Sequence, residues 1–198
     1  KYQEKNLSSL PNYEISSFLE IQKAKNTFKK VILEIGFGNG ENVFKFANNN
    51  RENLYIGSEV YMAGIGQLLG GIIANDLNNL KIVTGDIRLL LDEVKEPIFD
   101  DVVIICPDPW PKLKHHKRRM LNGNFLNLIH KTIKDDGHLF MSTDWENYAE
   151  SIEGAINQNE GFVKVKDSIY KEASLTKFQQ RAVKEGRKIY PFPLKKVS

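Results

Sequence analysis

A chain of 198 residues is the usual size of one domain with short extensions, and its 41% of hydrophobic residues is enough for a packed core, which argues against wholesale disorder. No apolar run approaches the roughly 20 residues that span a bilayer, so we expect a cytoplasmic protein with no membrane partner. The single cysteine, Cys106, excludes an internal disulfide and a cysteine-based zinc site.

The net charge of +3 conceals an uneven distribution of charged residues. Residues 109–134, which we call the first basic stretch, hold seven Lys or Arg and no acid. Residues 177–198, the second basic stretch, hold seven more and one acid, Glu185. Such segregation favours an anionic partner such as nucleic acid. The alternative is two solvated faces that never meet in space.

Residues 1–30 are polar and irregular, with at most a helix near residues 15–25, and we treat them as an N-terminal extension. From residue 31 onward, short apolar runs alternate with segments of helical spacing. The predicted strands are residues 31–35, 54–58, 80–83, 101–105 and 137–142, and the predicted helices are residues 41–47, 61–75, 87–94, 124–133 and 145–157. Strands that are apolar throughout indicate burial on both faces, and therefore a parallel sheet covered by crossover helices. The fold class is α/β, a doubly wound sheet within residues 31–198.

The C-terminal residues predict an addition to one edge of this sheet. Residues 162–169 and 188–194 have the composition of a β-hairpin, with a helix between its strands. We expect the last strand to be irregular, because Pro191 and Pro193 cannot donate hydrogen bonds to a ladder.

A glycine-rich turn follows the first predicted strand, where ligands of open α/β sheets bind. Glu34 is followed by Gly36, Gly38 and Gly40, and alternate glycines let the backbone turn tightly and approach a ligand. The dinucleotide fingerprint needs a third glycine at the position of Glu41, whose charge also suits a pyrophosphate poorly. The turn therefore favours another nucleotide-like cofactor, and the alternative is a plain strand-to-helix turn.

Acids also follow the second and third predicted strands. Glu59 is placed to accept both hydroxyls of a ribose, and Asp86 to accept an adenine amino group. Each could instead be a helix N-cap, and Asp86 is the clearest case. Their order along the chain favours binding of an adenosine-like cofactor.

The segment after the fourth predicted strand reads CPDPWPKLKHHKRR, from Cys106 to Arg119. Its three prolines fix the backbone and hold Asp108 rigidly at the strand end. The basic residues follow at once, so the cofactor pocket and an anion-binding surface are expected to be adjacent. Trp110 either stacks on a bound base or is buried against the sheet.

These motifs resemble those of a known family. The acid and glycine turn resembles the first motif of the class I methyltransferases that use S-adenosylmethionine. From residue 31 onward, the PDPWPKxxHxKRR pattern, Thr143-Asp144 and the TKFQQR segment at residues 176–181 resemble the bacterial tRNA (guanine-N7-)-methyltransferases. The resemblance implies a mostly parallel seven-stranded sheet and methyl transfer to N7 of a variable-loop guanine in tRNA.

The resemblance also implies a set of site residues. Asp108 is the expected catalytic residue. The expected cofactor-binding residues are Glu34, Gly36, Gly38, Gly40, Glu59, Asp86 and Asp108. The expected substrate-binding residues are Lys112, Asp144, Thr176, Lys177, Phe178 and Gln179, to which the basic run adds Lys117, Arg118 and Arg119. Gln179 departs from the family, which usually has Glu there. We expect tRNA as partner, no metal, and a monomer or homodimer.

The chemistry needs no general base, because guanine N7 carries a lone pair and no proton. We therefore expect Asp108 to orient the base and to stabilise its developing positive charge. Three alternatives remain. A small-molecule methyl or aminopropyl transferase would not need the basic run, and a nicotinamide-dependent dehydrogenase is disfavoured by the missing glycine. A nucleic-acid-binding module without catalysis would leave the ordered acids unexplained.

Overall fold

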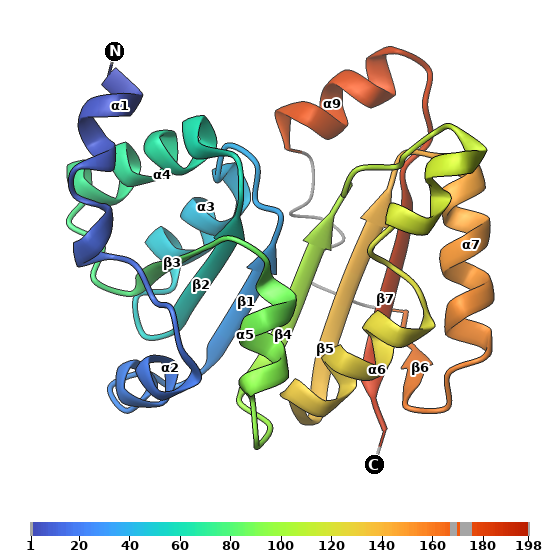
Figure 1. The fold of residues 1–198 in the computed structure, drawn as a ribbon, viewed down its shortest axis with the longest axis horizontal. Helices are drawn as coiled ribbons and strands as arrows, with labels where there is room; N and C mark the ends of the chain where they lie inside the picture. Colours follow the sequence, from blue (N-terminus) through green and yellow to red (C-terminus); the bar gives the residue numbers. More distant parts are fainter. Residues whose placement is uncertain (1, 167–169, 171–175, 198) are drawn as a thin grey trace.

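The computed structural model describes residues 2–166, 170 and 176–197, and Figure 1 shows their arrangement. The helices are α1 (Tyr2–Leu7), α2 (Phe18–Lys25), α3 (Glu41–Asn49), α4 (Met62–Ala74), α5 (Ile87–Glu93), α6 (Gly123–Thr132), α7 (Glu146–Asn157) and α9 (Lys177–Lys184). Two 3-10 helices are η1 (Leu10–Asn12) and η2 (Leu113–Arg118). The strands are β1 (Val31–Ile35), β2 (Leu54–Glu59), β3 (Leu80–Thr84), β4 (Phe99–Ile105), β5 (Ile133–Thr143), β6 (Phe162–Lys164) and β7 (Tyr190–Lys196).

The strands form one mixed seven-stranded sheet in the order β3-β2-β1-β4-β5-β7-β6. The first five strands in this order pair in parallel, whereas β7 pairs antiparallel with both β5 and β6. The predicted parallel strands and the C-terminal antiparallel addition are therefore confirmed, although β6 ends at Lys164 and residues 167–169 of the predicted strand lie outside the described residues. The chain leaves β1 toward β2 and later returns to add β4 on the other side of β1, which creates a switch point at the carboxyl ends of β1 and β4.

Helices cover both faces of the sheet, as a doubly wound fold requires. Along β1, Val31, Leu33 and Ile35 pack into one buried cluster with residues of α2, α5, α6 and α7, while Ile32 packs into a second cluster with residues of α3 and α4. The alternation follows from the two-residue repeat of a strand. Each face is therefore apolar, and polar side chains gather at the strand ends.

The N-terminal residues pack against the same sheet. Phe18 and Ile21 of α2 belong to the first buried cluster, and the backbone of Ile15 donates to the carbonyl oxygen of Ile82 in β3 at 2.8 Å. Asn6 of α1 donates its side-chain amide to the carbonyl of Gly66 in α4 at 3.1 Å. Of these N-terminal elements, the sequence predicts α2 but neither α1 nor η1.

The expectation that two prolines make the last strand irregular is wrong. The register of β7 against β5 is continuous from Tyr190 opposite Thr143 to Lys195 opposite His138. The carbonyl of Pro193 accepts a hydrogen bond from Val165, so the backbone of Pro193 faces the β6 side, and Pro191 two residues earlier faces the same way. The missing donors therefore do not interrupt the ladder with β5. Within the described part of the chain, no helix has the length and apolar character needed to cross a bilayer.

Candidate functional site

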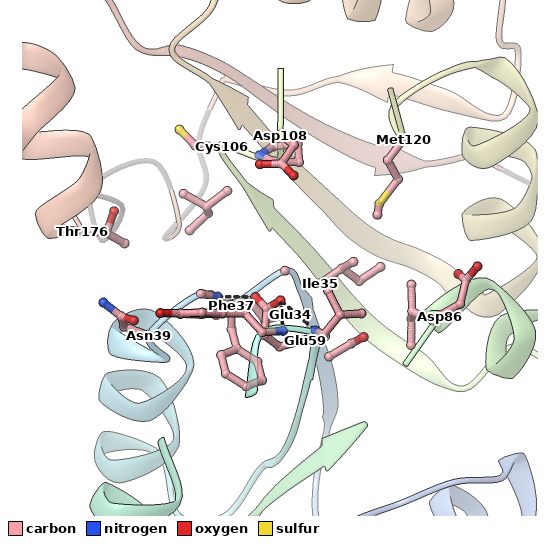
Figure 2. A pocket seen from close by; sticks show the side chains of 18 of the residues that line it. Glu34, Ile35, Phe37, Asn39, Glu59, Asp86, Cys106, Asp108, Met120 and Thr176 are labelled. Carbon is pink, nitrogen blue, oxygen red and sulfur yellow. Dashed lines mark hydrogen bonds between the residues drawn. The ribbon is translucent and has the colours of Figure 1, made fainter. Parts of the chain in front are cut away.

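A cavity of about 870 Å³ lies beyond the carboxyl ends of β1 to β4, at the switch point of the sheet. The turns after these strands and the start of α9 line it, and Figure 2 shows Asp108 across the cavity from Glu34 and Glu59. The predicted site residues that line it are Glu34, Gly36, Gly38, Glu59, Asp86, Asp108, Arg118, Thr176 and Lys177. The structure places the other predicted residues elsewhere: Gly40, Lys112, Lys117, Arg119, Asp144 and Gln179 are not part of the lining. The Phe178 side chain lies outside the described residues.

The glycine turn adopts the backbone conformation for which glycine is suited. Gly36, Gly38 and Gly40 have φ of 72°, 58° and 78°, in the left-handed region. Gly40 precedes the first residue of α3, and a Cβ there would lie 2.8 Å from the Leu68 side chain, so this glycine serves packing between α3 and α4. Gly36 and Gly38 are the two that face the cavity.

Glu59 fastens the glycine turn to the end of β2. Its Oε2 accepts a hydrogen bond from the backbone of Gly38 at 2.7 Å, and its Oε1 accepts from the backbones of Val60 at 2.7 Å and Tyr61 at 3.0 Å. The carboxylate thus lines the cavity with three amide donors already on it. Its outer lone pairs are the ones left for a ligand.

Asp86 is the N-cap of α5, as the alternative interpretation held. Its Oδ1 accepts from the backbone of Arg88 at 3.0 Å, and the Arg88 guanidinium forms an ion pair with it at 2.6 Å. The hydrogen bond from the Arg88 side chain lowers the pKa of Asp86 below its usual range. Asp86 also lines the cavity, so contact with a cofactor stays a prediction.

Glu34 lies at the floor of the cavity and is buried. The Asn42 side chain of α3 donates to its Oε2 at 2.8 Å. Burial in the low-polarity interior raises the pKa of Glu34 to about 8, and the single Asn42 hydrogen bond offsets only part of this. Its carboxyl is therefore mostly protonated near neutral pH.

Asp108 differs from the other three acids. It is exposed at the mouth of the cavity, and no described residue donates a hydrogen bond to it. A carboxylate without a partner in the protein is available to a ligand on all its lone pairs. Asp108 is the acid best placed to act on a substrate.

Trp110 lines the cavity beside Asp108 and is half-buried. The Arg118 guanidinium lies 4.8 Å from its ring centre, and the His115 ring meets it edge-on at 5.9 Å. The indole is therefore neither free nor packed into the core. It holds η2 against the mouth of the cavity.

The first basic stretch carries its charges on and around η2. Lys112, Lys114, Lys117 and Arg118 are exposed, and no carboxylate of the described residues lies within ion-pair distance of them. Because Arg118 and Lys177 both line the cavity, the two basic stretches meet there. The alternative of two separate solvated faces is wrong at this point.

The structure corrects the placement of Arg119. The sequence predicts an RNA-facing residue, but Arg119 is only 6% exposed. Its guanidinium donates to the carbonyl of Pro109 at 2.9 Å and to the Asn147 side chain at 3.0 Å, and it lies over the Tyr148 ring. The chain turns inward after η2, and the last residue of the basic run is therefore buried.

Of the residues expected from the C-terminal motifs, some line the cavity and others are buried. Thr176 and Gln179 form a capping box at the start of α9, in which Gln179 accepts from the Thr176 backbone at 3.1 Å and is completely buried. Lys177 forms an ion pair with Glu41 at 3.1 Å. Asp144 is 6% exposed and paired with Arg187. In this structure Gln179 and Asp144 are held by contacts within the protein, and their contact with a substrate stays a prediction.

Sequence reasoning missed several residues of the site. Tyr61 and Arg88 line the cavity. A Cβ on Gly64 would lie 1.9 Å from the carbonyl oxygen of Gly38, so this glycine allows α4 to approach the turn. The pairing of Glu41 with Lys177 had no signal in the sequence, because 136 residues separate the two. The T-x-x-Q capping box at Thr176 did have one.

Comparison with known proteins places this fold among methyltransferases. The chain superimposes on the 16S rRNA methyltransferase KamB with a TM-score of 0.68 at 12% identity, covering 93% of this chain and 96% of that one. It is also similar to a 30S ribosomal A1408 methyltransferase from an uncultured bacterium, with a TM-score of 0.65 at 18% identity and coverage of 93% and 100%. The sheet and the cavity define a class I methyltransferase fold.

The sequence relatives narrow this class to a family. Residues 28–192 match the family model described as "Putative methyltransferase". The tRNA (guanine-N(7)-)-methyltransferase of Wolbachia pipientis wMel is 38% identical over 181 residues, which are 91% of this chain and 81% of that protein. The tRNA (guanine-N(7)-)-methyltransferase of Nitrosomonas europaea is 39% identical over 189 residues, 92% of this chain and 84% of that protein. The chain belongs to the tRNA (guanine-N7-)-methyltransferase family.

Proposed function

We propose that this chain transfers a methyl group from S-adenosylmethionine to N7 of a guanine in tRNA, in the variable loop as the family resemblance implies. The observation that carries the proposal is the state of Asp108. It is the one predicted cofactor-side acid without a hydrogen-bond partner among the described residues, and it stands beside the exposed cations of η2. A free carboxylate next to unpaired cations suits a site where a nucleic acid brings one base to a fixed acid.

The lining of the cavity fits S-adenosylmethionine better than a dinucleotide. Its charged carboxylates are Glu41, Glu59, Asp86 and Asp108, since Glu34 is mostly protonated near neutral pH, and its cations are Arg88, Arg118 and Lys177. Two of those cations are already paired, Arg88 with Asp86 and Lys177 with Glu41. An acidic cavity favours a cationic ligand without phosphate groups. Glu59 would hold the ribose hydroxyls, Asp86 the adenine edge, and the Gly36–Gly38 turn the amino-acid part.

S-adenosylmethionine, when bound, supplies an electrophilic methyl group on a positively charged sulfur. The residues of this chain have two tasks, which are to hold the guanine in line and to stabilise the charge that develops on it. Asp108 performs both by accepting hydrogen bonds from guanine N–H groups, which become more acidic as the purine becomes cationic. No residue needs to remove a proton before methyl transfer, because N7 has none.

The exposed cations of η2 would hold tRNA phosphates near the cavity. Lys114 and Lys117 lie along the surface of η2, and Lys112 precedes it, close in sequence to Asp108. We expect Lys112 to contact the nucleotide that is modified, so its replacement by Ala should lower turnover more than it changes the salt dependence of tRNA binding. Arg118, which covers Trp110, would form the wall between the bound RNA and the cavity.

The test is transfer of labelled methyl from S-adenosylmethionine to unmodified bulk tRNA, with the product nucleoside identified after digestion. N7-methylguanine in the wild-type reaction and its loss in Asp108→Asn supports the proposal. Methylation of another base, or of a small amine in place of tRNA, would contradict it. Calorimetric titration with S-adenosylmethionine separates these enzymes from a binding module without catalysis, which would show no cofactor affinity.

A further inference from the structure

The loop that carries Asp108 has an unusual backbone. Cys106 and Trp110 have φ of 46° and 44°, in the left-handed region that non-glycine residues rarely adopt. Between them, Pro107 and Pro109 have no backbone N–H to donate. The loop thus holds Asp108 between two strained residues, and such a conformation persists only where the surroundings impose it.

The backbone of this loop is anchored at both ends, and the Cys106 thiol also lies 4.0 Å from the Ser142 hydroxyl. The backbone of Cys106 donates to the carbonyl of Ser142 in β5 at 2.9 Å, which continues the sheet. At the far end, the carbonyl of Pro109 accepts from Nε of Arg119 at 2.9 Å. The far end therefore depends on a side chain, whereas the near end depends on the sheet.

Arg119 is itself fixed to α7. Its Nη2 donates to the side chain of Asn147 at 3.0 Å, its Nη1 to the carbonyl of Asn147 at 3.4 Å, and its guanidinium lies 4.7 Å from the ring centre of Tyr148. The Tyr148 hydroxyl in turn accepts from the backbone of Leu121, just after Arg119. The planar guanidinium bridges acceptors on two residues, Pro109 and Asn147, at fixed angles, which a lysine ammonium cannot reproduce.

We infer that Arg119 is a positioning residue for methyl transfer: it fixes the Pro109 carbonyl to α7 and so holds Asp108 at the mouth of the cavity. It does not bind RNA phosphate, because its donors face acceptors of the protein and it is 6% exposed. Its neighbour Arg118 is exposed and has no described ion-pair partner. The inference rests on the proposed function, since it assigns Asp108 a role in transfer.

The experiment compares Arg119→Lys with Arg118→Lys and Arg118→Ala in the full chain. Wild-type transfer to bulk tRNA is measured first, and its absence would refute the proposed function and not the role of Arg119. For Arg119→Lys we expect turnover to fall at least tenfold, with S-adenosylmethionine affinity and the salt slope of tRNA binding unchanged. For Arg118→Ala we expect the slope to fall by roughly 0.7–0.9, as for one lost phosphate contact. Arg118→Lys keeps the charge and should keep the slope.

A readout independent of activity reports on the loop itself. In a Trp145→Phe background, the fluorescence anisotropy of Trp110 should fall in Arg119→Lys, because the far end of the loop is released. Asn147→Ala serves as the milder variant, and it decides the question if Arg119→Lys does not fold. We expect it to lower turnover severalfold with an unchanged salt slope. Wild-type turnover in the folded variant, or a salt slope that falls as in Arg118→Ala, would overturn the inference.

Discussion

The two basic stretches have the same number of Lys and Arg residues and differ in how many of these cations are paired with acids. In the second stretch, Arg181 pairs with Glu185, Arg187 with Asp144 and Glu185, Lys195 with Asp136, and Lys196 with Asp135. In the first, Lys134 pairs with Asp100, but the cations of η2 have no described carboxylate within ion-pair distance. A count of charges along the sequence therefore overestimates how much unpaired positive charge the second stretch offers to an anion.

The difference follows from where the acids lie in the fold. The acids that pair with the second stretch come from β5 and the residue after it, from the residue just after α9, and, for Lys177, from the start of α3. The segment around η2 contains no acid of its own, and the carboxylate that follows β4, Asp108, stays free at the cavity. Unpaired charge of both signs is thus concentrated at one place. This is where an RNA phosphate and a guanine base would both find partners.

The largest effect on methyl transfer is expected from removing the charge of Asp108, the free carboxylate. Asp108→Asn keeps the shape of the side chain and loses its charge, so the cationic purine loses its stabilising partner. We expect single-turnover methyl transfer to fall by about two to three orders of magnitude, as for loss of one preorganised electrostatic contact. S-adenosylmethionine affinity, measured by calorimetry, should change little. Turnover within about twofold of wild type would show that the charge of Asp108 has no role.

The next largest effect is expected on cofactor affinity, from replacing Glu59, the hydrogen-bonded acid at the end of β2. Glu59→Ala removes the acceptor of the ribose hydroxyls, and we expect S-adenosylmethionine affinity to weaken by about 1.5–3 kcal/mol per lost charged hydrogen bond. The structure adds a second consequence, because the amides of Gly38, Val60 and Tyr61 also lose their acceptor. Glu59→Gln keeps one acceptor oxygen and is the matched control, with a smaller loss. Unchanged affinity in the folded Ala variant would remove Glu59 from the site.

A direct test of the comparison uses two double variants that remove the same charge. Lys114→Ala with Lys117→Ala neutralises unpaired cations, and Arg181→Ala with Lys195→Ala neutralises paired ones. We expect the first to lower the slope of log tRNA affinity against log salt by roughly 0.7–0.9 for each contact, and the second to lower it by less than half as much. Filter binding of tRNA from low to physiological salt measures both slopes. Equal slopes in the two variants would show that pairing in the structure does not decide which cations contact RNA.

Much of the fold could be predicted from the sequence, because near-continuous apolar strands and helical spacing report burial directly. The predicted strands at residues 31–35 and 54–58 lie within one residue of β1 and β2. The start of β5 was missed: the structure begins it at Ile133, where the sequence predicts the end of a helix. Asp136 within β5 has a φ of 64°, in the left-handed region, and the pairing with β4 shifts between Phe99 and Asp101. Such an irregularity depends on the neighbouring strand and not on local composition.

The site was predicted in its location and only partly in its contacts. The acids and glycines after β1 to β4 do surround one cavity, because the ends of parallel strands meet at one edge. The sequence could not tell that Arg118 is exposed and Arg119 is buried, since both are arginines in one basic run. Only the turn of the chain after η2 directs Arg119 into the protein. The T-x-x-Q pattern at Thr176 is readable as a capping box, yet resemblance alone assigned it to substrate binding.

The last prediction concerns the buried acid Glu34, where we expect the smallest effect on turnover and a stability that depends on pH. Its ordinary pKa is 4.5 and burial raises it to about 8, so between these values the unfolded chain loses the proton while the folded protein keeps it. The free energy of unfolding of the cofactor-free protein therefore falls as pH rises through this window, by on the order of 1 kcal/mol per pH unit from this group, and levels off above it. Glu34→Gln has no proton to lose, so its stability advantage over wild type should grow from pH 5 to pH 8. Urea unfolding at pH 5, 7 and 9 measures the difference in the free energy of unfolding between each variant and wild type. For the control Glu150→Gln, at an exposed residue, this difference should not change with pH. A difference for Glu34→Gln that does not change with pH would mean that the carboxyl is charged in the folded protein, and that the cavity floor is acidic before any ligand binds.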